Sequence, residues 1–127
     1  MILLANTSSL LNIITSSTAN IDVHASYMDY NGSSFTPGVK NTAIVTATTT
    51  AIVNSPGPSV YRTVKTITIL NKHATTANTI TVIHTDGTTQ VELLKITLAA
   101  DEVLHYHESA GFWVTDAFGR TKLNDST

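Results

Sequence analysis

Residues 79–98 read TITVIHTDGTTQVELLKITL, and they carry the clearest secondary-structure pattern in the chain. Before the central Asp86-Gly87 pair, every second residue is apolar or aromatic: Ile80, Val82 and His84. After the pair the same spacing returns at Leu94, Ile96 and Leu98. Alternation with a period of two is typical of a half-buried β-strand, and Asp-Gly favours the type I′ turn of a hairpin. The stretch therefore predicts two antiparallel strands joined by a tight turn.

Segments on both sides of this hairpin repeat the pattern. Residues 21–29 alternate, with Ile21, Val23, Ala25 and Tyr27 on one face, and Asn31-Gly32 follows as a second hairpin turn. Further strands are expected at residues 10–15, 42–53, 60–70, 103–107 and 112–114. We expect residues 42–53 to form one long or bent strand, and Thr36-Pro37-Gly38 to form a bend.

The apolar phase of residues 60–70 shifts between Val64 and Ile67, which predicts a β-bulge. In total, about eight strands are expected, with turn signals every ~8–12 residues, and no segment reads as a helix. The sequence therefore predicts an all-β fold. The expected architecture is an antiparallel β-sandwich, of which the jelly roll is one form.

Composition favours one domain that works in an assembly. The chain has 127 residues, which suits a single domain over 1–127. Only 13% of its residues are charged, about half of the ~25% that is usual for soluble proteins. Net charge is −2 and the first cation is Lys40, so a nucleic-acid partner is not expected. Because repulsion between copies is weak at such a low charge, a homo-oligomer is favoured.

The first residues are apolar but interrupted. Polar residues 6–9 split the run, and no positive charge precedes it, so neither a signal peptide nor a membrane segment is expected. We expect synthesis in the cytoplasm without export. Residues 1–15 are predicted to form an arm that pairs with a neighbouring subunit, and residues 119–127 a polar tail. The predicted interface residues are Leu3, Leu4, Leu10, Leu11 and Trp113.

Candidate chemistry is sparse. His105-x-His107 on a strand places two imidazoles on one face, and His24 or His84 could complete a zinc or iron site of the kind seen in cupins. The glycine before the cupin motif and its later elements are missing, however. Ordinary strand histidines are therefore the favoured interpretation, and no metal, cofactor or catalytic residue is predicted.

Other residues allow weaker alternatives. His84 and Asp86 could belong to a catalytic triad, but the chain has no nucleophile elbow and no cysteine, and hairpin chemistry explains Asp86-Gly87. The aromatic residues could form a sugar-stacking platform: Tyr27, Tyr30, Tyr61, Tyr106, Phe112 and Trp113. Because Phe112 and Trp113 alternate, one of them is expected to be buried and the other to anchor an interface.

Several segments, taken in their order along the chain, resemble those of a known family. They are residues 21–27 with Asn31-Gly32, 36–38 with 41–43, 47–50, 62–65, 71–74 and 81–88. Together they resemble a family of small proteins encoded among the virion structural genes of tailed bacteriophages and prophages. The resemblance spans roughly residues 1–120, and it rests on no catalytic motif.

The resemblance implies a virion component and not an enzyme. The expected role is a capsid decoration, or cement, protein that binds the major capsid protein on the outer capsid surface as a homotrimer. It would be made in the host cytoplasm. The resemblance assigns no functional residues to this chain. The alternatives are a tail or fibre accessory protein that contacts host glycan, and a small cupin-like metal-binding protein that uses His105 and His107.

Overall fold

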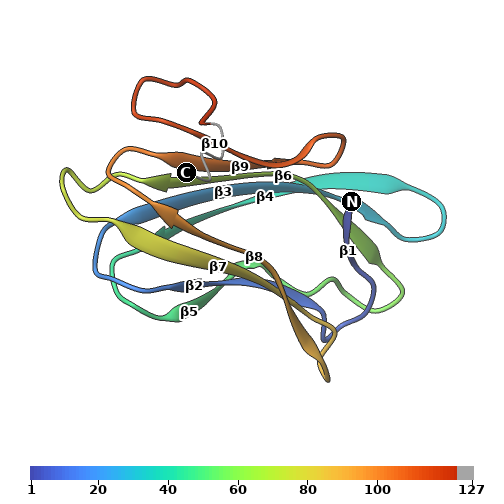
Figure 1. Ribbon diagram of the computed structural model, residues 1–127. Helices are drawn as coiled ribbons and strands as arrows, with labels where there is room; N and C mark the ends of the chain where they lie inside the picture. The colour runs from blue at the N-terminus through green and yellow to red at the C-terminus, as the bar shows by residue number, and fades with distance from the viewer. Residues whose placement is uncertain (123–127) are drawn as a thin grey trace.

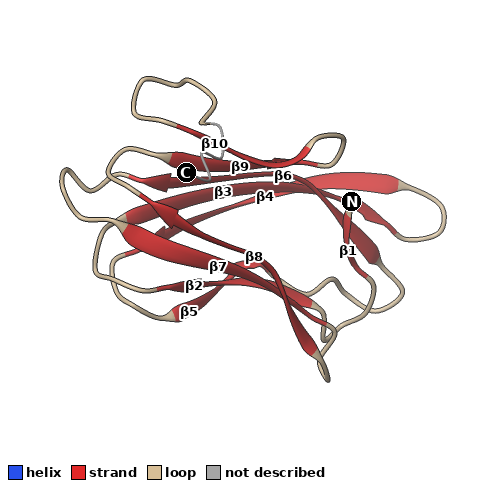
Figure 2. Cartoon of the chain, in the orientation of Figure 1, coloured by secondary structure: helices blue, strands red, loops and turns tan. Residues whose placement is uncertain are grey.

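A computed structural model describes residues 1–122, which form ten β-strands in two antiparallel sheets (Figures 1 and 2). The strands are β1 (Ile2–Leu4), β2 (Leu10–Thr15), β3 (Ile21–Tyr30), β4 (Phe35–Ile44), β5 (Thr49–Val53), β6 (Tyr61–Asn71), β7 (Asn78–Thr85), β8 (Gln90–Leu98), β9 (Val103–His107) and β10 (Gly111–Thr115). Over these residues no helix is long and apolar enough to cross a membrane. The predicted all-β sandwich is confirmed.

The larger sheet, sheet A, has the strand order β10-β9-β6-β3-β4. Strand β1 also belongs to it, because Ile2–Leu4 pairs with Arg62–Val64 on β6. Strands β9 and β1 both pair with β6, at Thr66–Leu70 and at Arg62–Val64. The smaller sheet, sheet B, has the order β5-β2-β7-β8.

The core lies between the two sheets, which face each other in Figure 1. Alternate residues of each strand point inward, as the period of a strand requires. The largest side chains buried there include Leu4, Leu11, Ile13, Ile21, Ile52, Ile67, Ile69, Ile80, Leu98 and Leu104. The predicted inward row of β3 is confirmed, since Ile21, Val23 and Ala25 are buried and Tyr27 packs against the core.

Both predicted hairpins are confirmed, but the Asp86-Gly87 turn is not of type I′, because φ is not positive at Asp86 and four residues, 86–89, connect the strands. Gly32 and Gly87 each adopt φ of 97°, a value that favours glycine. The side chain before each glycine also holds its turn: Asn31 Oδ1 accepts hydrogen bonds from the backbone of Ser33 and Ser34, and Asp86 Oδ1 accepts from Thr88 and Thr89. The bulge predicted between Val64 and Ile67 is present, because Ser26 pairs with Thr66 and Tyr27 with Val64.

Two of the expected elements are wrong. Thr36-Pro37-Gly38 is not a bend but part of β4, where Pro37 is tolerated because β4 lies at the sheet edge. Residues 42–53 are not one strand, because the chain leaves sheet A after Ile44 and enters sheet B at Thr49. The Thr15 hydroxyl secures this crossing by donating to the Thr46 carbonyl at 2.6 Å and accepting from the Thr48 amide at 3.1 Å.

The predicted N-terminal arm over residues 1–15 is also wrong. Strand β1 pairs with β6 of its own chain, and β2 is an inner strand of sheet B. Burial of Leu4 and Leu11 in the core draws the segment inward. Of the predicted tail, Thr121 bridges to Thr115, and the Lys122 backbone amide donates to the Val114 carbonyl at 2.7 Å. Residues 123–127 lie outside the described part.

Candidate binding surface on sheet A

The outward face of sheet A carries almost no charge. Register and alternation place these residues on it: Asp22, His24, Ser26, Met28 and Tyr30 of β3; Phe35, Pro37, Val39, Asn41 and Ala43 of β4; Tyr61, Thr63, Thr66, Thr68 and Leu70 of β6; Leu3; and His105, His107 and Trp113. Among these positions Asp22 is the only Asp, Glu, Lys or Arg, and it pairs with Lys72 at 3.1 Å. The bulged Lys65 pairs with Glu108 at the margin, at 3.0 Å.

An aromatic row crosses one end of this face. Phe35 on β4 lies opposite Tyr30 on β3, and Tyr30 lies opposite Tyr61 on β6. The rings of Tyr30 and Phe35 stack with centroids 4.6 Å apart and planes at 30°. The exposed fractions are 68% for Phe35, 37% for Tyr30 and 51% for Tyr61. Three neighbouring exposed aromatic residues form the kind of anchor that is enriched in interfaces.

Two local features bring the aromatic row together. The four-residue Asn31–Ser34 loop sets Tyr30 opposite Phe35. The bulge at Lys65 then shifts β6 by one residue against β3, which places Tyr61 opposite Tyr30. A shift of one residue moves a side chain to the other face of a sheet, so without the bulge Tyr61 would point inward.

A second row crosses the middle of the same face and contains two histidines. His24 Nδ1 lies 2.6 Å from Asn41 Oδ1, and His105 Nε2 lies 2.9 Å from Thr115 Oγ1. The imidazole of His105 stacks on Trp113 with centroids 5.1 Å apart and planes at 10°. Burial against this ring lowers the pKa of His105, because desolvation disfavours the charged imidazolium.

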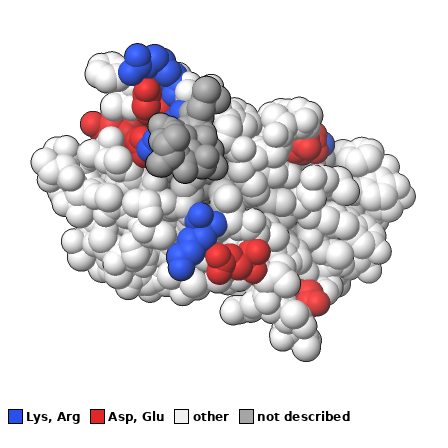
Figure 3. Space-filling view, viewed as in Figure 1, with Lys and Arg blue, Asp and Glu red and all other residues white. Residues whose placement is uncertain are grey.

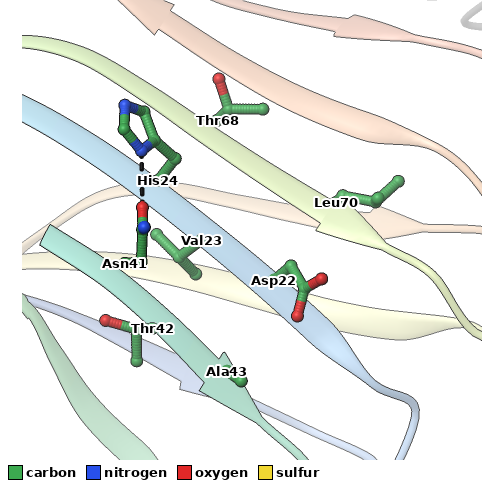
Figure 4. A pocket seen from close by; sticks show the side chains of 8 residues that line it. All are labelled: Asp22, Val23, His24, Asn41, Thr42, Ala43, Thr68 and Leu70. Carbon is green, nitrogen blue, oxygen red and sulfur yellow. Dashed lines mark hydrogen bonds between the residues drawn. The ribbon is translucent and has the colours of Figure 1, made fainter.

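Beside the first of these histidines the face is hollowed. The hollow has a volume of about 530 Å³ and is lined by Asp22, Val23, His24, Asn41, Thr42, Ala43, Thr68 and Leu70 (Figure 4). It is open and shallow, and its rim carries the imidazole of His24, its partner Asn41 and the carboxylate of Asp22 (Figure 4). Such a hollow suits a side chain from a partner surface.

The histidines do not gather as a metal site would require. His105 and His107 share one face as predicted, but His107 Nδ1 lies 2.8 Å from Ser109 Oγ. His84 belongs to sheet B, where its Nε2 lies 2.9 Å from the carbonyl of Leu3. Across residues 1–122, no three His, Cys, Asp or Glu side chains come close enough to hold an ion.

The carboxylates of residues 1–122 are spread over the molecule. Several of them form separate ion pairs: Asp22–Lys72, Asp29–Arg62, Glu102–Lys122 and Glu108–Lys65. Asp86 holds its turn, and the hydrogen bonds from the backbone of Thr89 and Thr88 lower the pKa of this carboxyl. The structure therefore brings no acid–base pair together among these residues.

The predicted interface residues divide between core and surface. Leu4 and Leu11 are both fully buried, so their assignment to an interface is wrong. Leu10 is half-buried on sheet B. Leu3, at 37% exposure, and the half-buried Trp113 both lie on the outward face of sheet A.

The proposed sugar-stacking platform is likewise divided. Tyr27, Tyr106 and Phe112 pack in or against the core, and only Tyr30, Tyr61 and Trp113 face outward. Sequence reasoning missed Phe35. The signal that could have found it was the Asn31-Gly32 turn, which sets the register of Phe35 against Tyr30.

Comparison of the chain with protein-family models, curated proteins and solved structures yields no match.

Proposed function

We propose that this chain is a virion structural protein of a tailed bacteriophage, and that it decorates the outer capsid surface. The observation that carries the proposal is the exposed aromatic row Phe35–Tyr30–Tyr61 on a nearly uncharged sheet face. The resemblance of several of its segments to small phage virion proteins supports its assignment to that class of protein. The aromatic row supports the assignment of the outward face of sheet A as the surface that contacts the capsid.

The physical role follows from this geometry. A sandwich with a continuous core keeps its outward face rigid, so little conformational entropy is lost when that face docks. The aromatic residues would seat on the major capsid protein, and the hollow beside His24 would receive one of its side chains. A protein that binds only the assembled shell stabilises that shell by mass action.

A second candidate function rests on the same aromatic row. Exposed aromatic rings also stack against sugar rings, so the row would suit a tail or fibre accessory protein that contacts host glycan. The two functions differ in partner and in copy number. A decoration protein occupies tens to hundreds of positions on each shell, whereas a tail component occupies few.

The experiment is a binding titration against capsids. Purified chain is mixed with capsids assembled from the major capsid protein encoded by the same genome, and the pellets are quantified after sedimentation. We expect saturation at a whole number of copies per shell position. Absence of binding to capsids, together with binding on a glycan array, would overturn the decoration role and support the accessory role.

A further inference from the structure

Strand β8 leaves one long edge of sheet B unpaired in the described chain. It runs over nine residues, Gln90–Leu98, and pairs only with β7. In Figure 1 it lies at the front of the sandwich. Two of its aliphatic side chains are well exposed, Val91 at 47% and Leu93 at 40%. Exposed edges of this length are usually blunted, because their free N–H and C=O groups can pair with another strand.

The other long edge strand, β4, carries a proline and β8 does not. Strand β4 carries Pro37 and Gly38 in its middle, and a proline removes a donor from the edge. Strand β8, with the sequence QVELLKITL, contains neither residue. Its charged residues Glu92 and Lys95 take part in none of the five ion pairs formed within residues 1–122.

A β-bulge lies at the centre of β8. Val82 of β7 pairs with Leu94, whereas the next residue, Ile83, pairs with Glu92, so Leu93 is the extra residue. A bulged pair of residues counts as one step of the strand. Glu92 and Lys95 therefore lie one step on either side of the bulge, and both point to the outward face of sheet B. Figure 3 shows cationic and anionic atoms side by side over this region, with uncharged atoms around them.

The sequence around this bulge is self-complementary. A two-fold axis through the bulge would set each residue of β8 opposite its counterpart on the other side. Glu92 would then face Lys95 of the second copy, and Val91 would face Ile96. Gln90 would face Thr97, and the central Leu93-Leu94 pair would face itself. Each of these pairs joins opposite charges, two apolar groups or two polar groups.

We propose that two copies of this chain pair antiparallel through β8 about a two-fold axis at the Leu93-Leu94 bulge, joining their B sheets into one continuous eight-stranded sheet. The charge complementarity of Glu92 and Lys95 selects a second copy as the occupant of this edge. Val91, Leu94 and Ile96 extend the apolar layer across the junction, since they point to the core side of sheet B. This dimer replaces the trimer expected from sequence, and it does not depend on the capsid role.

A charge-swap series tests the pairing by light scattering after size-exclusion chromatography. We expect the wild-type chain to have twice the 13.6 kDa chain mass. In Glu92→Lys or Lys95→Glu, both cross-strand charge pairs become repulsive, so the dimer dissociation constant should rise about tenfold or more. The double variant Glu92→Lys/Lys95→Glu restores opposite charges and should restore the dimer. Failure of the double variant to recover, a monomer, or three times the chain mass for wild type would each overturn the proposal.

A cross-link provides a second measurement that does not depend on charge. The chain has no cysteine, so a single introduced cysteine reports only on contacts between copies. Opposed residues of an antiparallel pair lie about 4.5–5.5 Å apart at Cα, within disulfide range. Leu94→Cys should form a disulfide dimer under mild oxidation. Val91→Cys is the matched control, because its two copies would lie four steps, or about 13 Å, apart. Cross-linking of the control but not of Leu94→Cys would contradict this register.

Discussion

The imidazole of His105 lies parallel to the indole of Trp113, with ring centroids 5.1 Å apart and planes at 10°. Thr115 holds the imidazole from the next outward position of β10, through a 2.9 Å hydrogen bond to Nε2. Burial lowers the pKa of His105 below its ordinary value of 6.5. The free energy of unfolding should therefore depend on pH through His105.

The first prediction concerns that pH dependence. His105 binds a proton less readily in the folded chain than in the unfolded chain, so its contribution to stability is complete above about pH 6.5. That contribution is lost as pH falls from 6.5 towards the lower folded-state pKa. Replacement by His105→Gln should remove this part of the slope in the free energy of unfolding, measured by urea titration at several pH values.

The chain's single tryptophan offers a direct readout, because a protonated imidazole quenches indole emission. Fluorescence of the folded wild-type chain should fall as His105 is protonated, with a midpoint below pH 6.5. The His107→Gln variant is the control and should keep this titration. A titration that survives in His105→Gln would show that another group is responsible.

The second prediction concerns the ion pair between Arg62 and Asp29. The guanidinium makes two parallel hydrogen bonds to the carboxylate, at 2.8 and 2.9 Å, and a third to the Asn54 carbonyl at 2.9 Å. It also lies 4.0 Å from the centre of the Tyr27 ring. The hydrogen bond with Asp29 is the main cause that raises the pKa of Arg62.

Arg62→Lys keeps the charge but loses this forked geometry, and should cost about 1–3 kcal/mol in the free energy of unfolding. Arg120→Lys is the matched control. Its side chain is 72% exposed, so the change should stay within about 0.5 kcal/mol. Equal losses in the two variants, measured by chemical denaturation, would refute the importance of the Arg62 geometry.

The third prediction tests the placement of the N-terminal strands. Leu4 and Leu11 are fully buried, whereas their neighbours Leu3 and Leu10 are exposed and half-buried. Leu4→Ala and Leu11→Ala should each destabilise the chain by about 2–5 kcal/mol. Leu3→Ala should cost less than about 1 kcal/mol. A free arm would instead tolerate all of these substitutions, and thermal unfolding separates the two outcomes.

Local sequence signals predict much of this fold, but they do not predict the pairings between strands that are distant in sequence. The turns at Asn31-Gly32 and Asp86-Gly87 are encoded by two adjacent residues each, so they could be predicted. The pairing of β1 with β6 joins residues about sixty positions apart, and no local pattern reports it. The break at residues 45–48 falls inside a Thr-rich run, and the hydrogen bonds that hold it come from the Thr15 hydroxyl on another strand.

The fourth prediction concerns Asn71, a fully buried side chain at the end of β6. Its Nδ2 donates to the carbonyls of Thr76 and Leu98, each at 3.0 Å, and its Oδ1 accepts from the His73 amide at 3.1 Å. Asn71→Ala leaves the buried Leu98 carbonyl without this partner, which should cost about 1–3 kcal/mol. Asn41→Ala, on the exposed sheet face, is the control and should cost little in the same denaturation experiment.

The candidate surface was less predictable than the fold. Alternation correctly separates Phe112, which packs against the core, from Trp113, which faces outward. The aromatic row, however, needs two registers to be known at once, the Tyr30–Phe35 hairpin and the bulged β3–β6 pair. The phase shift after Val64 predicts the bulge. The position of Tyr61 on the sheet, however, depends on which strand pairs with β6 there, and local sequence patterns do not identify that strand.

Capsid binding by the double variant Phe35→Ser/Tyr61→Ser decides whether the aromatic row is the contact surface. Both side chains are exposed, so the variant should keep the wild-type circular dichroism spectrum. The control is Ile14→Ser, which removes an apolar side chain, 36% exposed, from the outward face of sheet B. We expect the double variant to lose about 2 kcal/mol or more of binding free energy, roughly thirtyfold in the dissociation constant, while the control binds as wild type. Undiminished binding by the double variant would show that the capsid does not contact the aromatic row.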